Sequence, residues 1–449
     1  MVGELPPGTA LRTAAAGMDC VIDGLLGSGG QGEVYRARLD GGLVAVKWYH
    51  EAYVEAFPNQ IQLLEAAISS GPPDHRFLWP LDLVSLDGSP SFGYIMPLRD
   101  ERFVEMTRLV DGSTPMTLYS MATAGFQLAD SFGRLHLQGF CYRDISFGNV
   151  FANPATGAVT ICDNDNVGSS NDPSWVGGTP KFIAPELVRG ESVPNRQTDL
   201  WSLAVLLFYL LMQDHPLDGA REASVRVHDD YADRWLYGDA PIFIFDPADD
   251  SNRPVNDVND HYQVNALVRW PLWPGFIRDL FRRSFTLGAL DPDERVGENE
   301  WREAMSRLRD SWFRCQCGAE CFHDVEAMRD TYGGRPAPCA HCGREPILPP
   351  RVLLTRADGK ESVVVLGPGK RLFKHHLESG APCELETALA VTGQLSGDAD
   401  SLILENTSGS CWTVEDASGQ PAQVAYGDAV ALTDGREINF AGCIGLVHT

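Results

Sequence analysis

Short apolar runs separated by turn residues dominate the first hundred positions, a pattern typical of β-strands. The runs at residues 34–39 and 43–49 flank an Asp-Gly-Gly turn, which predicts a hairpin. Residues 77–84 and 92–98 predict two more strands, and the apolar spacing of residues 58–69 predicts a helix between the strand pairs. This region therefore predicts a strand-rich lobe with one helix.

From residue 117 onward, apolar positions recur at helical spacing. Four helices are expected, at residues 118–137, 198–212, 275–285 and 298–312. The apolar run at residues 200–212 is shorter than the roughly 20 residues that cross a membrane, so it predicts a buried core helix. The final hundred residues return to short apolar runs between Gly, Asp and Ser turns, which predicts an all-β domain.

Composition indicates a globular protein of more than one domain. The chain has 449 residues, of which 44% are hydrophobic and 22% charged. Acidic residues outnumber basic ones by 61 to 36, a formal charge of −25, which disfavours binding to nucleic acid or to anionic membranes. The N-terminal residues lack the apolar core of a signal peptide, so we expect a cytoplasmic protein.

A glycine-rich turn and a lysine carry the first chemical signal. Residues 27–34 read Gly-Ser-Gly-Gly-Gln-Gly-Glu-Val, and glycines let backbone amides approach phosphate oxygens. A strand follows this turn, whereas a dinucleotide-binding fold would require a helix. Lys47 closes the next apolar strand, where it either reaches nucleotide phosphates or extends into water. A hairpin without a ligand is the alternative, but the two features together favour nucleotide binding.

A second group of motifs supplies two acids and an amide. Residues 142–149 read Tyr-Arg-Asp-Ile-Ser-Phe-Gly-Asn, which spaces a proton acceptor, Asp144, five residues before a metal ligand, Asn149. Asp163 ends a predicted strand in Asp-Asn-Asp, where a further metal ligand is expected. Residues 178–186 then match the end of an activation segment. A surface turn with a chance Asp and Asn is the alternative.

These motifs, in this order, resemble those of the eukaryotic-type protein kinases over residues 19–312. The resemblance implies a two-lobed fold that binds ATP and Mg²⁺ and phosphorylates a protein Ser or Thr hydroxyl. It implies that Lys47 binds the α/β-phosphates, that Asn149 and Asp163 bind magnesium, and that Asp144 deprotonates the hydroxyl. The residues that it assigns to the nucleotide site are Gly27, Ser28, Gly29, Gly30, Gln31, Gly32, Val34, Ala45, Lys47, Glu65 and Met96.

Two ion pairs follow from the same resemblance. A glutamate of the predicted helix should hold Lys47; Glu65 has the better spacing and Glu55 is the alternative. Arg295 should form a buried structural pair with Glu186. The second pair stabilises the fold and takes no part in catalysis.

Several positions depart from the kinase pattern. Tyr142 replaces the usual histidine, and Ser146 replaces a lysine that contacts the transferred phosphate. Asn164 and Asp165 replace Phe and Gly, and Asp165 is either a second metal carboxylate or a solvated loop acid. Thr179 matches a threonine that contacts the catalytic aspartate in Ser/Thr kinases, which favours Ser/Thr substrates. A pseudokinase scaffold that binds nucleotide without catalysis is the rival interpretation.

Three details resemble one bacterial subgroup of these kinases. They are the Tyr-Arg-Asp motif, the sequence Cys-Asp-Asn-Asp-Asn-Val, and His-Pro-Leu-Asp-Gly at residues 215–219. Members of this subgroup are found beside a metal-dependent phosphatase and a von Willebrand A protein, so these are the partners that the resemblance implies. The members also carry a cysteine cluster after the kinase domain.

Five of the eleven cysteines fall within residues 315–342. Two knuckles, Cys-Gln-Cys-Gly and Cys-Ala-His-Cys-Gly, resemble a zinc ribbon, in which four thiolates bind Zn²⁺ and close the site. Cys321 and His323 are alternative ligands, and reduced cysteines without a metal are the other interpretation. The predicted zinc ligands are Cys315, Cys317, Cys339 and Cys342.

The last hundred residues faintly resemble the forkhead-associated β-sandwich, through residues 402–408, 426–428 and 438–440. The elements that bind phosphothreonine in that family are not evident, so we expect a sandwich that recognises a partner. His375 and His376 are expected at the surface.

The expected fold class is α+β: a β-rich N-lobe and a helical C-lobe, followed by a small zinc ribbon and an all-β sandwich. The expected boundaries are 1–18 for an N-terminal tail, 19–98 for the N-lobe, 99–312 for the C-lobe, 313–348 for the zinc-ribbon-like segment and 349–449 for the β domain.

Overall fold

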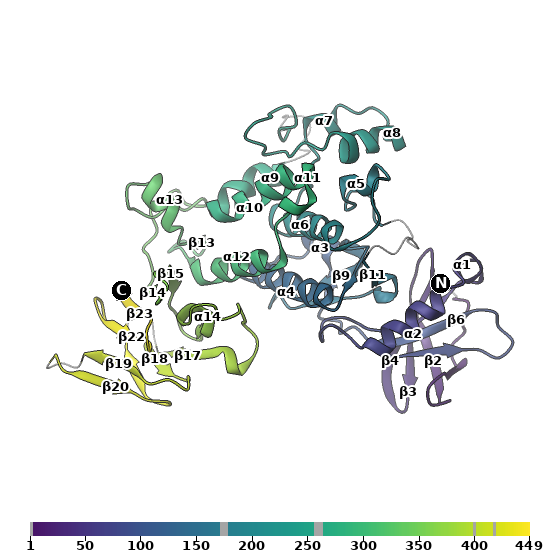
Figure 1. The fold of residues 1–449 in the computed structure, drawn as a ribbon, viewed down its shortest axis with the longest axis horizontal. Coiled ribbons are helices and arrows are strands. Elements are labelled where there is room, and N and C mark those ends of the chain that lie inside the picture. Colours follow the sequence, from purple (N-terminus) through teal and green to yellow (C-terminus); the bar gives the residue numbers. More distant parts are fainter. Residues whose placement is uncertain (1–2, 171–177, 256–263, 398–400, 416–418) are drawn as a thin grey trace. The chain divides into compact units, whose positions relative to one another are not determined.

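The computed structural model describes residues 3–170, 178–255, 264–397, 401–415 and 419–449 (Figure 1). The chain divides into two compact units. The first contains Met1–Met116, Gln127–Leu267 and Phe281–Glu298, and the second contains Thr117–Phe126, Val268–Leu280 and Asn299–Thr449. The strand-rich lobe and the residues of the kinase-like motifs belong to the first unit.

A closed barrel of antiparallel strands forms the N-terminal lobe, in the order β1-β2-β3-β4-β6-β5. Its strands are β1 (Ala10–Thr13), β2 (Asp19–Ser28), β3 (Gly32–Leu39), β4 (Gly42–Tyr49), β5 (Asp82–Ser85) and β6 (Phe92–Pro97). Two helices, α1 (Glu51–Ala56) and α2 (Gln60–Ser70), follow β4. The strand predicted at residues 77–84 is wrong in its first part, where Phe77 makes only an isolated bridge to Ile161.

The residues expected to form an N-terminal tail are part of this barrel. β1 pairs with both β2 and β5, and it closes the sheet. Leu5 and Leu11 are buried in the core of the lobe beside Tyr35 and Val46. The predicted boundary at residue 19 is therefore wrong, because two apolar side chains within the first eleven residues pack into the core.

The predicted hairpin is confirmed and fixes the position of Lys47. β3 and β4 are joined through Asp40 and Gly41, whose φ angles of 47° and 75° lie in the left-handed region that tight hairpin turns require. In this register Lys47 lies opposite Val34 on β3. Gly32, at the start of β3, approaches β4 so closely that a Cβ atom there would lie 2.1 Å from the carbonyl oxygen of Trp48. Glycine is therefore required at this position.

The four helices expected from the apolar spacing are present as α4 (Leu118–Leu137), α6 (Arg196–Met212), α10 (Gly275–Phe285) and α12 (Glu298–Ser311). α6 is buried along most of its length, as its apolar run predicts, and begins with reciprocal hydrogen bonds between Asn195 and Thr198. Among the described residues, no helix is both long and apolar enough to cross a membrane.

Short elements precede α4 or lie between these helices. They are β7 (Val104–Glu105), α3 (Met106–Val110), β8 (Phe140–Cys141), β9 (Val150–Ala152), β10 (Val159–Ile161), β11 (Gly168–Ser169), α5 (Pro185–Val188), α7 (Ala220–Ala223), α8 (Asp230–Asp233), α9 (Val264–Arg269) and α11 (Leu287–Leu290). β9 pairs with both β7 and β10, and β8 pairs with β11. These two small sheets carry the segments that hold Asn149 and Asp163.

The residues after α12 form mainly strands, in the second unit. β12 (Trp312–Arg314) pairs with β13 (Glu320–Phe322), and α13 (Val325–Asp330) follows. A six-stranded sheet has the order β15-β14-β23-β22-β19-β20, and a four-stranded sheet has the order β16-β17-β18-β21. Their bounds are β14 (Arg351–Thr355), β15 (Glu361–Val365), β16 (Arg371–Phe373), β17 (Val391–Ser396), β18 (Ile403–Asn406), β19 (Trp412–Glu415), β20 (Pro421–Val424), β21 (Ala429–Ala431), β22 (Glu437–Asn439) and β23 (Ile444–His448).

Side chains of both sheets share one apolar core, which includes Trp412, Phe440 and Leu404. The strands expected in this region are therefore present, together with the short helix α14 (Lys374–Leu377) and a 3₁₀ turn at Ala388–Ala390.

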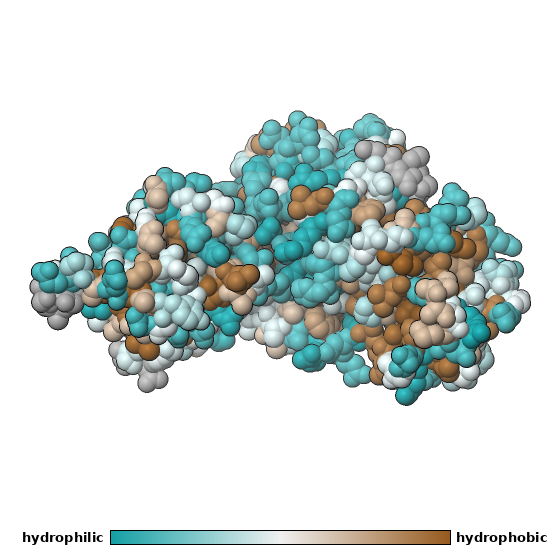
Figure 2. All heavy atoms as spheres, turned by 60° about the horizontal axis from the view of Figure 1, so that its bottom comes forward, coloured by the Kyte–Doolittle hydropathy of each residue, from teal (hydrophilic) through white to brown (hydrophobic). Residues whose placement is uncertain are grey.

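Hydrophilic residues cover most of the face seen in Figure 2, in keeping with the charge of −25. Hydrophobic residues gather at the right of this view, where Figure 1 draws the strands of the N-terminal lobe. The exposed apolar side chains of this lobe include Leu26, which is 53% exposed and directly precedes the glycine-rich turn. An apolar side chain at the edge of this turn is thus available to a ligand.

Candidate functional site

The glycine-rich turn lies next to Lys47. β2 ends at Ser28 and β3 begins at Gly32, and the N–H of Gly29 donates to the carbonyl oxygen of Gly32 at 2.9 Å. The side-chain oxygen of Gln31 accepts a hydrogen bond of 2.7 Å from Lys47 Nζ. The turn expected to bind phosphate is therefore in direct contact with the lysine expected to bind phosphate.

Two carboxylates flank the ammonium group of Lys47, which is 4% exposed. Nζ lies 2.8 Å from Asp165 Oδ2 and 3.6 Å from Asp163 Oδ1. Burial lowers the pKa of Lys47, but Asp165 and Asp163 outweigh this effect and raise the pKa above its ordinary value. Lys47 is therefore charged at neutral pH.

The predicted pairing of Lys47 with Glu65 is not formed in this structure. Glu65 and the alternative, Glu55, are both exposed. The buried polar residue that α2 contributes to the site is Gln60, whose amide nitrogen donates to the backbone oxygen of Asp165 at 3.0 Å. The spacing of acids along a helix could not reveal that the inward residue of this helix is an amide.

The carboxylate of Asp144 is held on both oxygens. Oδ1 accepts hydrogen bonds from the hydroxyl of Thr179 at 2.7 Å and from its backbone N–H at 2.9 Å. Oδ2 accepts from the amide nitrogen of Asn149 at 2.9 Å. The contact expected between Thr179 and the aspartate is confirmed, and the carboxylate has a fixed orientation.

Asp199, in α6, holds the backbone of the segment that carries Asp144. Its carboxylate accepts from the N–H groups of Tyr142 and Arg143 and lies 3.0 Å from His136 Nε2.

The Tyr142 hydroxyl donates to the backbone oxygen of Cys162. The tyrosine that replaces the usual histidine thus connects the Asp144 segment to the residue that precedes Asp163.

Asp163 stands in a left-handed conformation, with φ of 51°, directly before a 3₁₀ turn at Asn164–Asn166. The side-chain nitrogen of Asn164 donates to the carbonyl oxygens of Leu78 at 2.9 Å and Ile161 at 3.2 Å, which fixes the turn. Burial raises the pKa of Asp163, against the lowering effect of Lys47. Its side chain nevertheless remains 37% exposed, so a ligand can reach it.

Asn149 and Asp163 suit a magnesium ion. The N–H of Cys162 donates to the backbone oxygen of Asn149 at 2.9 Å, so the two ligand-bearing segments are adjacent. The hydrogen bonds from the Asn149 side chain to Asp144 use its nitrogen, so they leave the amide oxygen unused. Carboxylate and amide oxygens are the ligands that a hard divalent cation prefers.

The remaining residues assigned to the nucleotide site lie along the strands of the lobe. Ala45 and Met96 are paired across β4 and β6, and both are buried. They belong to one apolar cluster, against which Val34 packs. This cluster provides an apolar surface next to the buried lysine.

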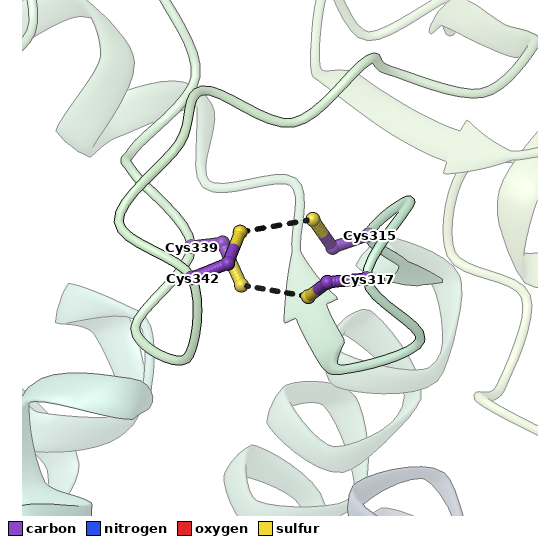
Figure 3. A group of neighbouring side chains, drawn as sticks. All are labelled: Cys315, Cys317, Cys339 and Cys342. Atoms are coloured by element: carbon purple, nitrogen blue, oxygen red, sulfur yellow. Dashed lines mark hydrogen bonds between the residues drawn. The ribbon is translucent and has the colours of Figure 1, made fainter.

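The four cysteines predicted to bind zinc lie together in the second unit (Figure 3). The sulfur atoms of Cys315 and Cys342 are 3.8 Å apart, and those of Cys317 and Cys339 are 3.7 Å apart. A tetrahedral site with Zn–S bonds of about 2.3 Å requires sulfur atoms separated by about 3.8 Å, so these thiols fit a zinc ion. The alternative ligands Cys321 and His323 are not part of this group.

A second group of metal-ligand types, Asp310, His375 and His376, also lies in the second unit. His376 is 3% exposed, so its expected surface position is wrong. Its Nδ1 accepts the N–H of Phe373 at 3.1 Å and its Nε2 lies 3.1 Å from Asp310 Oδ2. A neutral histidine with an acceptor Nδ1 carries its proton on Nε2, so it donates to Asp310 and is not free to bind a metal there.

Sequence reasoning did not single out Tyr49 and Gln60, which both contact Asp165 in the site. The only sequence signal was the second acid of the Asp-Asn-Asp motif.

Comparison with known proteins agrees with this geometry. The sequence profile of the protein kinase domain matches residues 21–237. Protein kinase C delta type of Rattus norvegicus is 34% identical over 110 residues, which are 23% of this chain and 16% of that protein. Protein kinase MCK1 of Saccharomyces cerevisiae is 32% identical over 112 residues, or 24% of this chain and 30% of that protein.

Protein kinase C zeta type of Oryctolagus cuniculus is similar over a shorter stretch, with 35% identity over 88 residues, or 19% of this chain and 15% of that protein. The chain thus spans less than a third of the length of these relatives. Together with the geometry of Lys47, Asp144, Asn149 and Asp163, the matches identify a protein kinase domain at residues 21–237 of this chain, similar to those of eukaryotic-type protein kinases.

Proposed function

We propose that this chain is a serine/threonine protein kinase that transfers the γ-phosphoryl group of Mg-ATP to a protein hydroxyl. The observation that carries the proposal is the fixed carboxylate of Asp144, which accepts hydrogen bonds from Thr179 on one oxygen and from Asn149 on the other. A carboxylate oriented in advance can accept the proton of a substrate hydroxyl without reorganising first. The hydroxyl contact from Thr179 supports Ser/Thr specificity.

Phosphoryl transfer depends mainly on positioning and charge stabilisation. Lys47 and the glycine-rich turn would bind the phosphates, and Asn149 and Asp163 would hold Mg²⁺, which supplies positive charge to the phosphate oxygens. The substrate hydroxyl oxygen forms a bond to the γ-phosphorus while the bond from that phosphorus to the ADP oxygen breaks. Asp144 accepts the hydroxyl proton.

Labelled ATP tests this proposal on the purified full chain. The wild type should label itself or a generic acceptor protein on Ser or Thr, as phosphoamino-acid analysis would report. Asp144→Asn removes the proton acceptor and should slow labelling by about 10²-fold or more. At about 1.4 kcal/mol for each factor of ten, this raises the barrier by about 3 kcal/mol. A wild-type chain that binds Mg-ATP but labels nothing above the Asp144→Asn background would contradict the proposal.

A pseudokinase scaffold is the second candidate, and Ser146 and Asn164 favour it. Ser146 is buried where kinases usually have a lysine that contacts the transferred phosphate, and Asn164 holds its turn through hydrogen bonds instead of an apolar ring. Such a scaffold would bind nucleotide to organise partners. The orientation of Asp144, which nucleotide binding alone does not require, favours the active kinase.

A structural zinc ion, bound by Cys315, Cys317, Cys339 and Cys342, is part of the proposal, and the spacing of their sulfur atoms supports it. The sheets formed by β14–β23 would act as a sandwich that recognises a partner. The resemblance to the bacterial subgroup makes a phosphatase and a von Willebrand A protein the proposed partners in a signalling system. A cytoplasmic location would keep the clustered thiols reduced.

A further inference from the structure

Asp165 is the closest acidic partner of Lys47 in the described part of the chain. Lys47 Nζ lies 2.8 Å from Asp165 Oδ2, compared with 3.6 Å from Asp163 Oδ1. The side chain of Asp165 has no exposed surface, whereas that of Asp163 is 37% exposed. The two acids of the Asp-Asn-Asp motif therefore have different environments, one buried against the ammonium group and one open to a ligand.

Two further side chains hold Asp165 in place. The Tyr49 hydroxyl donates to Asp165 Oδ2 at 2.5 Å, so this oxygen accepts from both Tyr49 and Lys47. Gln60, in α2, donates to the Asp165 backbone oxygen at 3.0 Å and to the Tyr49 hydroxyl oxygen at 3.2 Å. Side chains of β4 thus hold the carboxylate of Asp165, and Gln60 of α2 holds its backbone oxygen.

Helix α2 contributes this amide and no acid to the site. Its one glutamate, Glu65, is exposed, as is Glu55 of α1. The lysine is consequently anchored to the turn that follows Asp163, not to a helix. A displacement of α2 would remove the hydrogen bonds of Gln60 but would leave the ion pair between Lys47 and Asp165.

A metal role for Asp165 fits this geometry poorly. Its Oδ2 is occupied by two donors. Its Oδ1 has no hydrogen-bond partner in the described part of the chain, but the side chain has no exposed surface through which a cation could reach it. Asp163, with its exposed side chain, can bind an ion without breaking these contacts.

We propose that Asp165 is the positioning residue of Lys47, in the role that a helix glutamate was expected to fill, and that Asp163 is the metal ligand of the pair. This inference rests on the proposed kinase function, in which Lys47 binds the nucleotide phosphates.

The test compares four variants of the full chain: Asp165→Asn, Asp163→Asn, Glu65→Gln and Glu55→Gln. ATP affinity is measured with a fluorescent, non-hydrolysed ATP analogue and Mg²⁺, and transfer is measured with labelled ATP over a range of Mg²⁺ concentrations. Asp165→Asn should weaken analogue binding several-fold and lower kcat/KM by about 10²-fold, the loss that follows from a small misplacement of a binding group. Its Mg²⁺ concentration for half-maximal rate should equal that of the wild type. Asp163→Asn should raise that concentration.

The two glutamate variants test the rival assignment. Glu65→Gln and Glu55→Gln should bind the analogue and transfer phosphate like the wild type. If Glu65→Gln loses activity while Asp165→Asn retains it, the inference is overturned. If Asp165→Asn shifts the Mg²⁺ dependence as Asp163→Asn does, Asp165 is a metal ligand and the inference is again overturned.

Tyr49→Phe covers the case in which Asp165→Asn does not fold. It removes one donor to Asp165 and keeps the ring, so it should weaken analogue binding by a smaller factor, with an unchanged Mg²⁺ dependence; wild-type binding in this variant would contradict the inference. Failure of the proposed function is distinguishable: a wild type that binds the analogue but transfers nothing refutes the kinase, while the binding comparison still tests Asp165. A wild type that does not bind the analogue overturns both.

Discussion

Glu186 and Arg295, 109 residues apart in the chain, form a bidentate ion pair in which each guanidinium NH₂ group lies 2.8 Å from one carboxylate oxygen. Glu186 is 8% exposed and Arg295 is 5% exposed. Arg295 also donates to the backbone oxygens of Gly288 and Gln197 at 2.9 and 2.8 Å. The pair therefore ties the end of the activation segment to the segment after α11, as the sequence predicts.

Removal of either partner should destabilise the first unit strongly. Glu186→Gln or Arg295→Met leaves one charge buried without its counterpart, which costs about 3–5 kcal/mol. Thermal or urea unfolding of the full chain would measure this loss. As a control, Arg102→Ala breaks the exposed pair with Asp100 and should change unfolding little. Equal effects of the buried and exposed variants would contradict this prediction.

The cysteine cluster should hold about one zinc ion per chain, as a site with four thiolates at tetrahedral separation does. Elemental analysis of protein purified without added metal measures the content. Cys339→Ser should lose the metal and destabilise the second unit, because metal binding and folding are coupled in such sites. Cys411→Ser, at an exposed cysteine outside the cluster, is the control and should keep the zinc. Sub-stoichiometric zinc together with free titration of the clustered thiols would refute the site.

His136 should make the kinase domain less stable in alkaline solution. Burial lowers its pKa, but hydrogen bonds to Asp199 and Glu298 outweigh burial and raise the pKa to about 9. The pKa of His136 in the folded chain is therefore higher than its pKa of about 6.5 in the unfolded chain. The charged histidine stabilises the fold fully below about pH 6.5, and this stabilisation is lost as the pH rises through 9. The expected loss is roughly 3 kcal/mol, at about 1.4 kcal/mol for each unit of pKa difference.

Unfolding at pH 6, 7.5 and 9.5 would measure this effect. His136→Gln, which cannot take up the proton, should be less stable than the wild type at pH 6 and should lack this alkaline loss. A wild type and a variant whose stabilities change in parallel over this range would show that His136 is not charged in the folded chain.

The sequence pattern predicted the elements that are determined by residues close together in the chain. The hairpin of β3 and β4 follows from its turn residues, and the buried helix α6 follows from an uninterrupted apolar run. Strand β1 escaped prediction because its two inward side chains, Leu11 and Thr13, give too short a pattern. Residues 77–81 have the composition of a strand, but Phe77 and Trp79 are buried in a connecting segment whose strand pairing is limited to an isolated bridge.

The residues of the candidate site show the same difference between local motifs and contacts that join distant parts of the chain. Asp144, Asn149 and Asp163 could be proposed as site residues from spacing, because each lies within a short motif. The partner of Lys47 could not, because that contact joins residues 118 positions apart and depends on which side chain of α2 faces inward. His376 was misassigned for a similar reason, since its partner Asp310 lies 66 residues away.

The hydroxyl of Thr179 should contribute to catalysis through Asp144. It donates to Asp144 Oδ1 at 2.7 Å, beside the backbone N–H bond of 2.9 Å that any residue at this position would keep. A hydrogen bond to a charged group contributes about 1.5–3 kcal/mol, so Thr179→Val, which keeps the shape and removes the hydroxyl, should lower kcat by about 10- to 100-fold. The KM for ATP should change by less than about threefold, because the bond acts on the proton acceptor and not on the phosphates. Thr179→Ser restores a hydroxyl and should recover most of the rate, whereas equal rates for the Val and Ser variants would mean that the hydroxyl does not contribute to the orientation of Asp144.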